Sequence, residues 1–83
     1  MRGTVKYINP HRGMVAVQTE DGEYSVFESL GGDFEINDEV SWDAHNPLGG
    51  ETITNHTQQM CICVSFENHY VPLSQLRSAL LMG

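Results

Sequence analysis

Short apolar stretches rich in β-branched and aromatic residues, broken about every ten residues by Gly, Pro, Asn or Asp, constrain this chain most. Asn9-Pro10 indicates one turn, and Asp21-Gly22 indicates a tight hairpin of type I′. No helical periodicity appears before residue 70. The pattern therefore predicts an all-β barrel or sandwich, with strands over residues 3–8, 14–19, 24–27, 39–43 and 51–56 and a loop over 45–50.

The last third of the chain has a different pattern. Residues 60–67 alternate strictly, so that one face of a strand carries Met60, Ile62, Val64 and Phe66 and the other carries Cys61, Cys63, Ser65 and Glu67. Pro72 suits the first turn of a helix, and Leu73, Leu76, Ala79 and Leu80 then share one helical face. We interpret residues 60–82 as an appended strand followed by a short amphipathic helix.

Size and composition point to one small globular domain. The chain has 83 residues, 40% of them hydrophobic, which leaves room for a single core. It contains no apolar run long enough to cross a membrane, and its first residues lack the apolar region of a signal peptide. We therefore expect a cytoplasmic protein with no membrane partner.

Charge is distributed unevenly along the chain. The net charge is −7, but residues 1–19 carry Arg2, Lys6 and Arg12 and no acid, a sum of +3. All eleven acids follow, with Arg77 as the single base among them, a sum of −10. One interpretation is a basic strip that meets a polyanion; the other is that acidic loops keep a small domain soluble and the early bases have no role.

The residues offer no case for an enzyme, a metal site or a cofactor. Cys61 and Cys63 sit two apart, which is awkward for a disulfide, and no second cysteine pair completes a zinc site. His56 and His69 do not supply the spacing of a zinc finger. There is no Gly-rich phosphate loop and no Ser-His-Asp pattern. We expect free thiols and a chain that binds rather than catalyses.

Over its first 57 residues the chain resembles a cold-shock domain. Gly3-Thr4-Val5-Lys6-Tyr7-Ile8-Asn9 resembles the opening G-x-V-K-W-F-N strand of that family, and Arg12-Gly13-Met14-Val15-Ala16-Val17 stands where the family has K-G-F-G-F-I. Tyr24-Ser25-Val26-Phe27 stands where it has F-V-H-F, and similar strands follow over 37–42 and 49–55. The segments come in the family's order and at nearly its spacing.

The resemblance implies a small five-stranded, OB-fold-like antiparallel barrel over residues 1–57, with the extra strand and short helix of 58–83 packed on the same domain. It also implies binding of single-stranded RNA or DNA by stacking on exposed aromatic residues. The site residues that it assigns are Lys6, Tyr7, Arg12, Met14, Tyr24 and Phe27.

The chain departs from the family pattern at Ile8, Met14, Ala16 and Val26, where the family has an aromatic residue or His. Each lost stacking platform removes roughly 1–3 kcal/mol of binding free energy per base, so we expect weak nucleic-acid binding. The alternative is a protein-interaction or self-associating module that has lost nucleic-acid binding and uses the C-terminal strand and helix. The position of the C-terminal segment discriminates between them, because nucleic acid is excluded if it covers the face of Tyr7, Met14 and Tyr24. Phe27 and Trp42 also suit a core.

Overall fold

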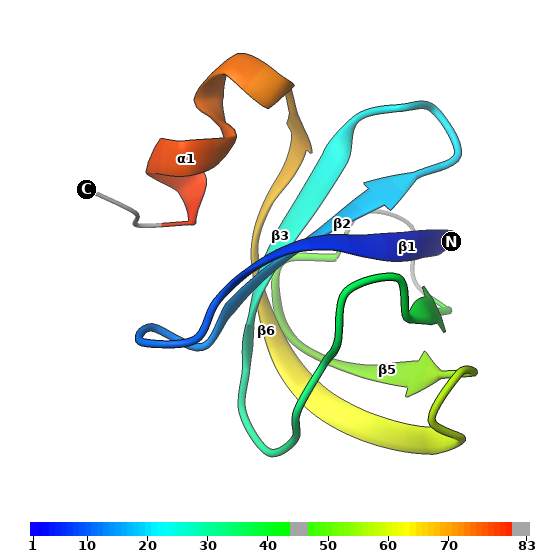
Figure 1. Ribbon diagram of the computed structural model, residues 1–83. Coiled ribbons are helices and arrows are strands. Elements are labelled where there is room, and N and C mark those ends of the chain that lie inside the picture. The colour runs from blue at the N-terminus through cyan, green and yellow to red at the C-terminus, as the bar shows by residue number, and fades with distance from the viewer. Residues whose placement is uncertain (44–46, 81–83) are drawn as a thin grey trace.

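Six antiparallel strands close into one barrel, and a short helical segment lies outside it (Figure 1). The computed structural model describes residues 1–43 and 47–80. Parts of the expected loop over 45–50 and of the expected helix, namely residues 45, 46, 81 and 82, lie outside that range. The elements are β1 (Arg2–Asn9), β2 (Met14–Thr19), β3 (Tyr24–Ser29), β4 (Glu39–Ser41), β5 (Gly49–Asn55), β6 (Met60–Val71), the 3-10 turn η1 (Leu73–Gln75) and α1 (Leu76–Ala79).

The strand order around the barrel is β1-β2-β3-β6-β5-β4, with β4 paired back onto β1. A small all-β barrel with an additional C-terminal strand and a short helix is thus confirmed. The additional strand differs from the expectation in its position. β6 lies between β3 and β5 and is bonded to both, so it closes the barrel rather than adding to a barrel completed by residue 57.

The turns follow from local sequence. Asn9-Pro10 does form a turn, in which the Arg12 amide donates to the Asn9 carbonyl. The hairpin at residues 20–23 is also present, but its type differs from the prediction. Of its residues only Gly22 has a positive φ, 86°, and the Gly22 amide donates to the Thr19 carbonyl. A type I′ turn requires positive φ at both central residues, so this hairpin does not contain a type I′ turn.

Two apolar clusters lie on the two sides of the β2–β3 sheet. The interior cluster contains four aromatic residues: Phe27, Phe34, Trp42 and Phe66. Phe27 packs against Phe34 and Phe66, and Trp42 packs against Phe66, with ring centroids 5.0–5.3 Å apart. Gly3 allows β1 to approach β2 closely here, because a Cβ at Gly3 would come within 2.3 Å of Val17. We call the second set the outer cluster; its buried members are Met14, Ala16, Tyr24, Val26, Val71, Leu76 and Leu80.

β6 follows its predicted alternation and then continues beyond it. Ile62, Val64 and Phe66 are buried, whereas Cys61 and Cys63 are exposed. Met60, which the alternation assigns to the same face as Ile62, is exposed at the start of the strand. The strand extends to Val71 rather than ending near residue 67, with register shifts against β3 on the way. Tyr70 has a φ of 56° and lies within the second of these shifts, between Asn68 and Val71. A β-bulge of this kind bends the strand that contains it. Val71 then lies in the outer cluster, opposite Tyr24.

The buried carboxylate of Asp38 joins two connecting segments of the barrel. Asp38 accepts hydrogen bonds from the Asn55 side chain at 2.8 Å, the Gln58 side chain at 2.6 Å and the Glu35 amide at 2.9 Å. Burial by itself would raise the pKa of Asp38, but these three hydrogen bonds outweigh it and lower the pKa below its ordinary value of 3.8. The charged form therefore links the loop after β3 to the hairpin between β5 and β6.

The described residues contain no helix that is long and apolar enough to cross a bilayer.

We predict that truncation after Gln59 abolishes the cooperative fold. It removes Ile62, Val64 and Phe66 from the interior and leaves one edge of β3 and one edge of β5 unpaired. Thermal unfolding followed by circular dichroism measures this, with a chain ending at Leu80 as the control that retains all six strands and the helical segment. A product truncated at Gln59 that melts as cooperatively and as high as the full chain would contradict the prediction.

Asp38→Asn should lower the free energy of unfolding by roughly 1–3 kcal/mol near neutral pH, because buried donors lose a charged acceptor. The native pKa lies below the unfolded value. The stabilisation is therefore fully present above about pH 4 and is lost as the pH falls through the native pKa. Urea unfolding of both chains between neutral pH and about pH 2 measures this. Glu20→Gln, at an exposed position, is the control. A difference that stays constant across that range would refute the assignment.

Candidate functional site

The helical segment, residues 72–80, packs on the outer face of the barrel where β1, β2, β3 and β6 meet. Leu76 and Leu80 are 3% and 1% exposed and contact the side chains of β2 and β3 in the outer cluster. The Asn9 side-chain amide donates a buried hydrogen bond of 2.7 Å to the Leu80 carbonyl. This bond ties the end of the segment to the end of β1.

The helix is shorter than its sequence pattern suggests, and this changes the role of Leu73. α1 has four residues, and Leu73 belongs to the preceding 3-10 turn. Leu76, Ala79 and Leu80 face the barrel as predicted, whereas Leu73 is 63% exposed. Pro72 lies just before this turn in an extended conformation, with ψ of 156°.

Of the six predicted nucleic-acid-binding residues, three are buried. Phe27 lies in the barrel interior with no exposed surface, so it cannot stack on a base. The structure supports the alternative interpretation, that Phe27 is a core residue. Met14 and Tyr24 are 4% and 9% exposed and lie in the outer cluster under the helical segment. Burial raises the pKa of the Tyr24 hydroxyl, with a smaller contribution from Tyr7.

Tyr7, Lys6 and Arg12 remain exposed, but the structure separates them. A register shift between Val5 and Tyr7 places Lys6 at a bulge and leaves Tyr7 on the outer face, 43% exposed. The Tyr7 ring meets the Tyr24 ring edge-on at a centroid distance of 6.0 Å. Arg12 lies in the turn after β1, and the three residues line three different hollows of the surface.

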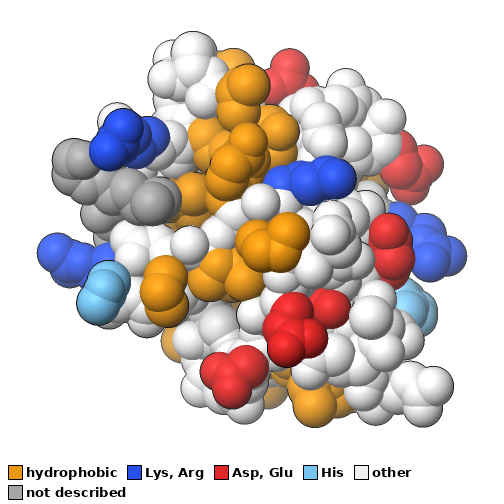
Figure 2. All heavy atoms as spheres, viewed as in Figure 1, with side chains coloured by type: hydrophobic (Ala, Val, Ile, Leu, Met, Phe, Trp, Pro, Cys, Tyr) orange, Lys and Arg blue, Asp and Glu red, His pale blue; other side chains and the backbone are white. Residues whose placement is uncertain are grey.

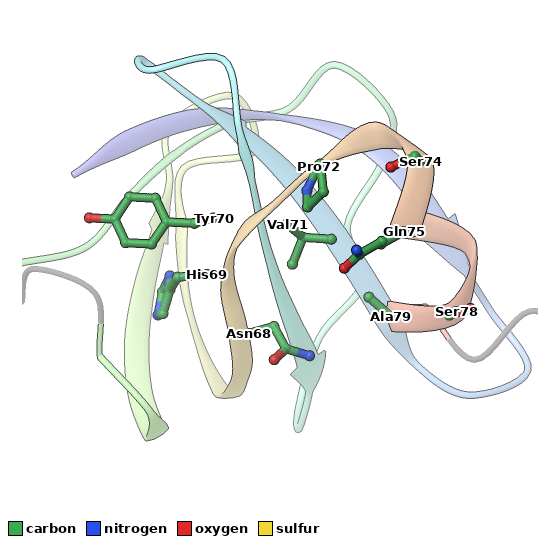
Figure 3. Close-up of a pocket in the computed structure, with 9 residues that line it drawn as sticks. All are labelled: Asn68, His69, Tyr70, Val71, Pro72, Ser74, Gln75, Ser78 and Ala79. Carbon is green, nitrogen blue, oxygen red and sulfur yellow. The ribbon is translucent and has the colours of Figure 1, made fainter.

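Two grooves run along the helical segment on its β6 side. One, of about 520 Å³, lies between Ser74, Gln75 and Ser78 of that segment and Asn68–Pro72. In Figure 3, Val71 and Gln75 face this space, whereas His69 and Tyr70 point to the opposite side of β6. The second, of about 360 Å³, shares Asn68 and Ser78 and contains Arg12 together with Glu28 and Glu67, so Arg12 does not form a purely basic site.

A third groove, here named the β1–α1 groove, lies on the other side of the helical segment. It has a volume of about 260 Å³ and is lined by Tyr7, Leu73, Leu76, Arg77 and Leu80. A strip of hydrophobic side chains is visible beside the C-terminal segment in Figure 2. The sequence analysis did not include Leu73 and Arg77 among the site residues. The available signal was a leucine-rich segment without acids in a strongly acidic chain.

The histidines and cysteines that the structure describes do not converge on a metal site. Within residues 1–43 and 47–80, no group of three or more His, Cys, Asp and Glu side chains is placed to hold a metal ion. His56 bonds the Ser41 hydroxyl at 2.7 Å. His69 bonds the Ser25 hydroxyl at 2.8 Å and the Pro47 carbonyl, and its ring stacks on Phe66. Both histidines thus connect parts of the barrel to one another.

Comparison with protein-family models, with curated proteins and with solved structures gave no match for this chain.

Proposed function

We propose that this chain is a protein-interaction module, in which the helical segment replaces a nucleic-acid site with a protein-binding surface. The observation that carries the proposal is the packing of Leu76 and Leu80 over Met14 and Tyr24. The resemblance to cold-shock domains assigns that same face to bases. Because the face is occupied by the chain itself, a single strand has no access to it.

The residues that remain exposed support weak nucleic-acid binding at most. Tyr7 is the one predicted aromatic residue with substantial exposure, and a single stacking platform contributes roughly 1–3 kcal/mol. Lys6 and Arg12 add two phosphate contacts, against a net charge of −7. Nucleic-acid binding stays a prediction, and the resemblance stays an interpretation of the sequence.

Exposed apolar side chains beside the helical segment favour a protein partner. Tyr7 is 43% exposed and Leu73 is 63% exposed, and both border the β1–α1 groove with Arg77. Tyrosine and arginine are among the residues that contribute most to protein interfaces. By contrast, pairing of a second copy along residues 64–66 of β6 would require the barrel to open, because these residues are paired with β3 on one edge and with β5 on the other.

A photo-crosslinking amino acid at position 73 in the full chain tests the proposal in cells. Leu30 is the matched control, since it is an exposed leucine (57%) in the loop after β3, at the far end of the barrel from α1 (Figure 1). We expect discrete protein adducts from position 73 and none of the same size from position 30. The captured protein should then bind the purified chain, and Leu73→Ser should weaken that binding by about tenfold.

Binding to nucleic acid instead of protein would give different results in these experiments. Saturable shifts of the Lys6, Tyr7 and Arg12 resonances with short oligonucleotides, together with crosslinks to RNA alone, would overturn the proposal in favour of nucleic-acid binding. Absence of any position-specific adduct and of any oligonucleotide shift would also count against it.

A further inference from the structure

The two walls of the β1–α1 groove differ in charge from the rest of the molecule. From β1 the groove is lined by Tyr7, and from the segment 72–80 it is lined by Arg77 and three leucines. Arg77 is the one charged residue of this lining, and none of the eleven acids lines it. Arg2 and Lys6 of β1 line a separate hollow together with Glu20 and Glu39. The groove thus carries one positive charge and no negative charge, on an acidic protein.

The floor of the groove is aliphatic. Leu76 and Leu80 are buried against the barrel and form its base, while Leu73 and Tyr7 stand exposed at its rims. A surface with an apolar centre and a charged border has the composition of a protein-binding patch. Arg77 itself lines the groove, so a negative group of a bound ligand would lie beside its guanidinium.

We propose that the β1–α1 groove binds a short acidic, amphipathic segment of a partner protein. An apolar side chain of that segment enters between Tyr7 and Leu73, and a carboxylate of the segment lies against Arg77. The inference rests on the proposed protein-interaction function and specifies the surface and the chemistry of the partner. Charge complementarity supplies the selectivity, because a basic segment would be repelled by Arg77 and would find no acid in the lining.

Two other occupants fit the groove less well. Its volume of about 260 Å³ is below the roughly 300–1,000 Å³ typical of small-molecule pockets, which suits one anchoring side chain better than a whole ligand. Nucleobases stack on flat aromatic rings, and the lining contains one such ring, Tyr7, among three leucines. An aliphatic lining suits an aliphatic or aromatic side chain of a polypeptide.

Selection of random 12-residue peptides displayed on phage against the full chain tests the inference. We expect the enriched peptides to combine acidic residues with one or two large apolar residues. A selected peptide, synthesised with a fluorescent label, should shift the resonances of Tyr7, Leu73 and Arg77. Arg77→Glu and Leu73→Ser should each weaken its binding by about tenfold, whereas Leu30→Ser should change it less than about twofold. These positions are exposed, so the substitutions are expected to leave the fold intact.

Salt dependence provides a second readout. Raising the salt concentration from about 0.1 M to about 1 M shortens the Debye length from about 10 Å to about 3 Å, so the attraction between the peptide's carboxylates and Arg77 should weaken. Enrichment of basic or uncharged peptides, or binding that is insensitive to both Arg77→Glu and salt, would overturn the inference. A saturable oligonucleotide shift at Tyr7 and Arg77 would also overturn it.

A second copy of the chain is a further outcome that would overturn the inference. The loop around Ile36, which is 51% exposed and follows Glu35, has the chemistry that the groove selects. Concentration-dependent sedimentation abolished by both Ile36→Ser and Leu73→Ser would identify that loop as the occupant. If the photo-crosslinker at position 73 captures a specific partner and no acidic peptide is selected, the groove chemistry is wrong and the proposed function stands. If neither occurs, both fail.

Discussion

The structure depends on a sheet that is apolar on both faces. In β2 and β3 the residues that point into the barrel and those that point out of it are nearly all buried. An antiparallel sheet commonly has one face in water, so double burial requires a second cover. Residues 72–80 are that cover, held by Leu76 and Leu80 and by the hydrogen bond from Asn9 to the Leu80 carbonyl. Removing it would expose Met14, Ala16 and Val26 together.

This requirement connects stability to function. A cold-shock-like face binds single strands because its outward side chains are aromatic and exposed. Here the corresponding positions include Met14, Ala16 and Val26, which pack well under a helix and offer bases little to stack on. The same side chains that give the predicted nucleic-acid site few stacking platforms make the face suitable for covering. The covering segment then creates new surface at its edges, and the β1–α1 groove is the apolar part of that surface.

The sequence predicted the strands well because alternation and turn residues are local signals. The positions of β1, β2 and β3 agree with it, as does β6 up to residue 67, and so does the burial of Ile62, Val64 and Phe66. The position of β6 between β3 and β5 was not predictable in this way, since strand pairing is set by residues far apart in the chain. The run Met14-Val15-Ala16-Val17 was an available sign of burial on both faces, because it lacks alternation. The exposure of Leu73 depends on a 3-10 turn that its helical spacing did not reveal.

The contact between the helical segment and the outer face is the central claim, and nuclear Overhauser effects measure it directly in the full chain. We predict cross-peaks from the Leu76 and Leu80 methyl groups to the Tyr24 ring and the Met14 methyl group, at every concentration at which the chain stays monomeric. Absence of these cross-peaks, with the amides of residues 73–80 exchanging as fast as those of an unfolded peptide, would contradict the account. The sheet face of Met14 and Tyr24 would then be open to a ligand.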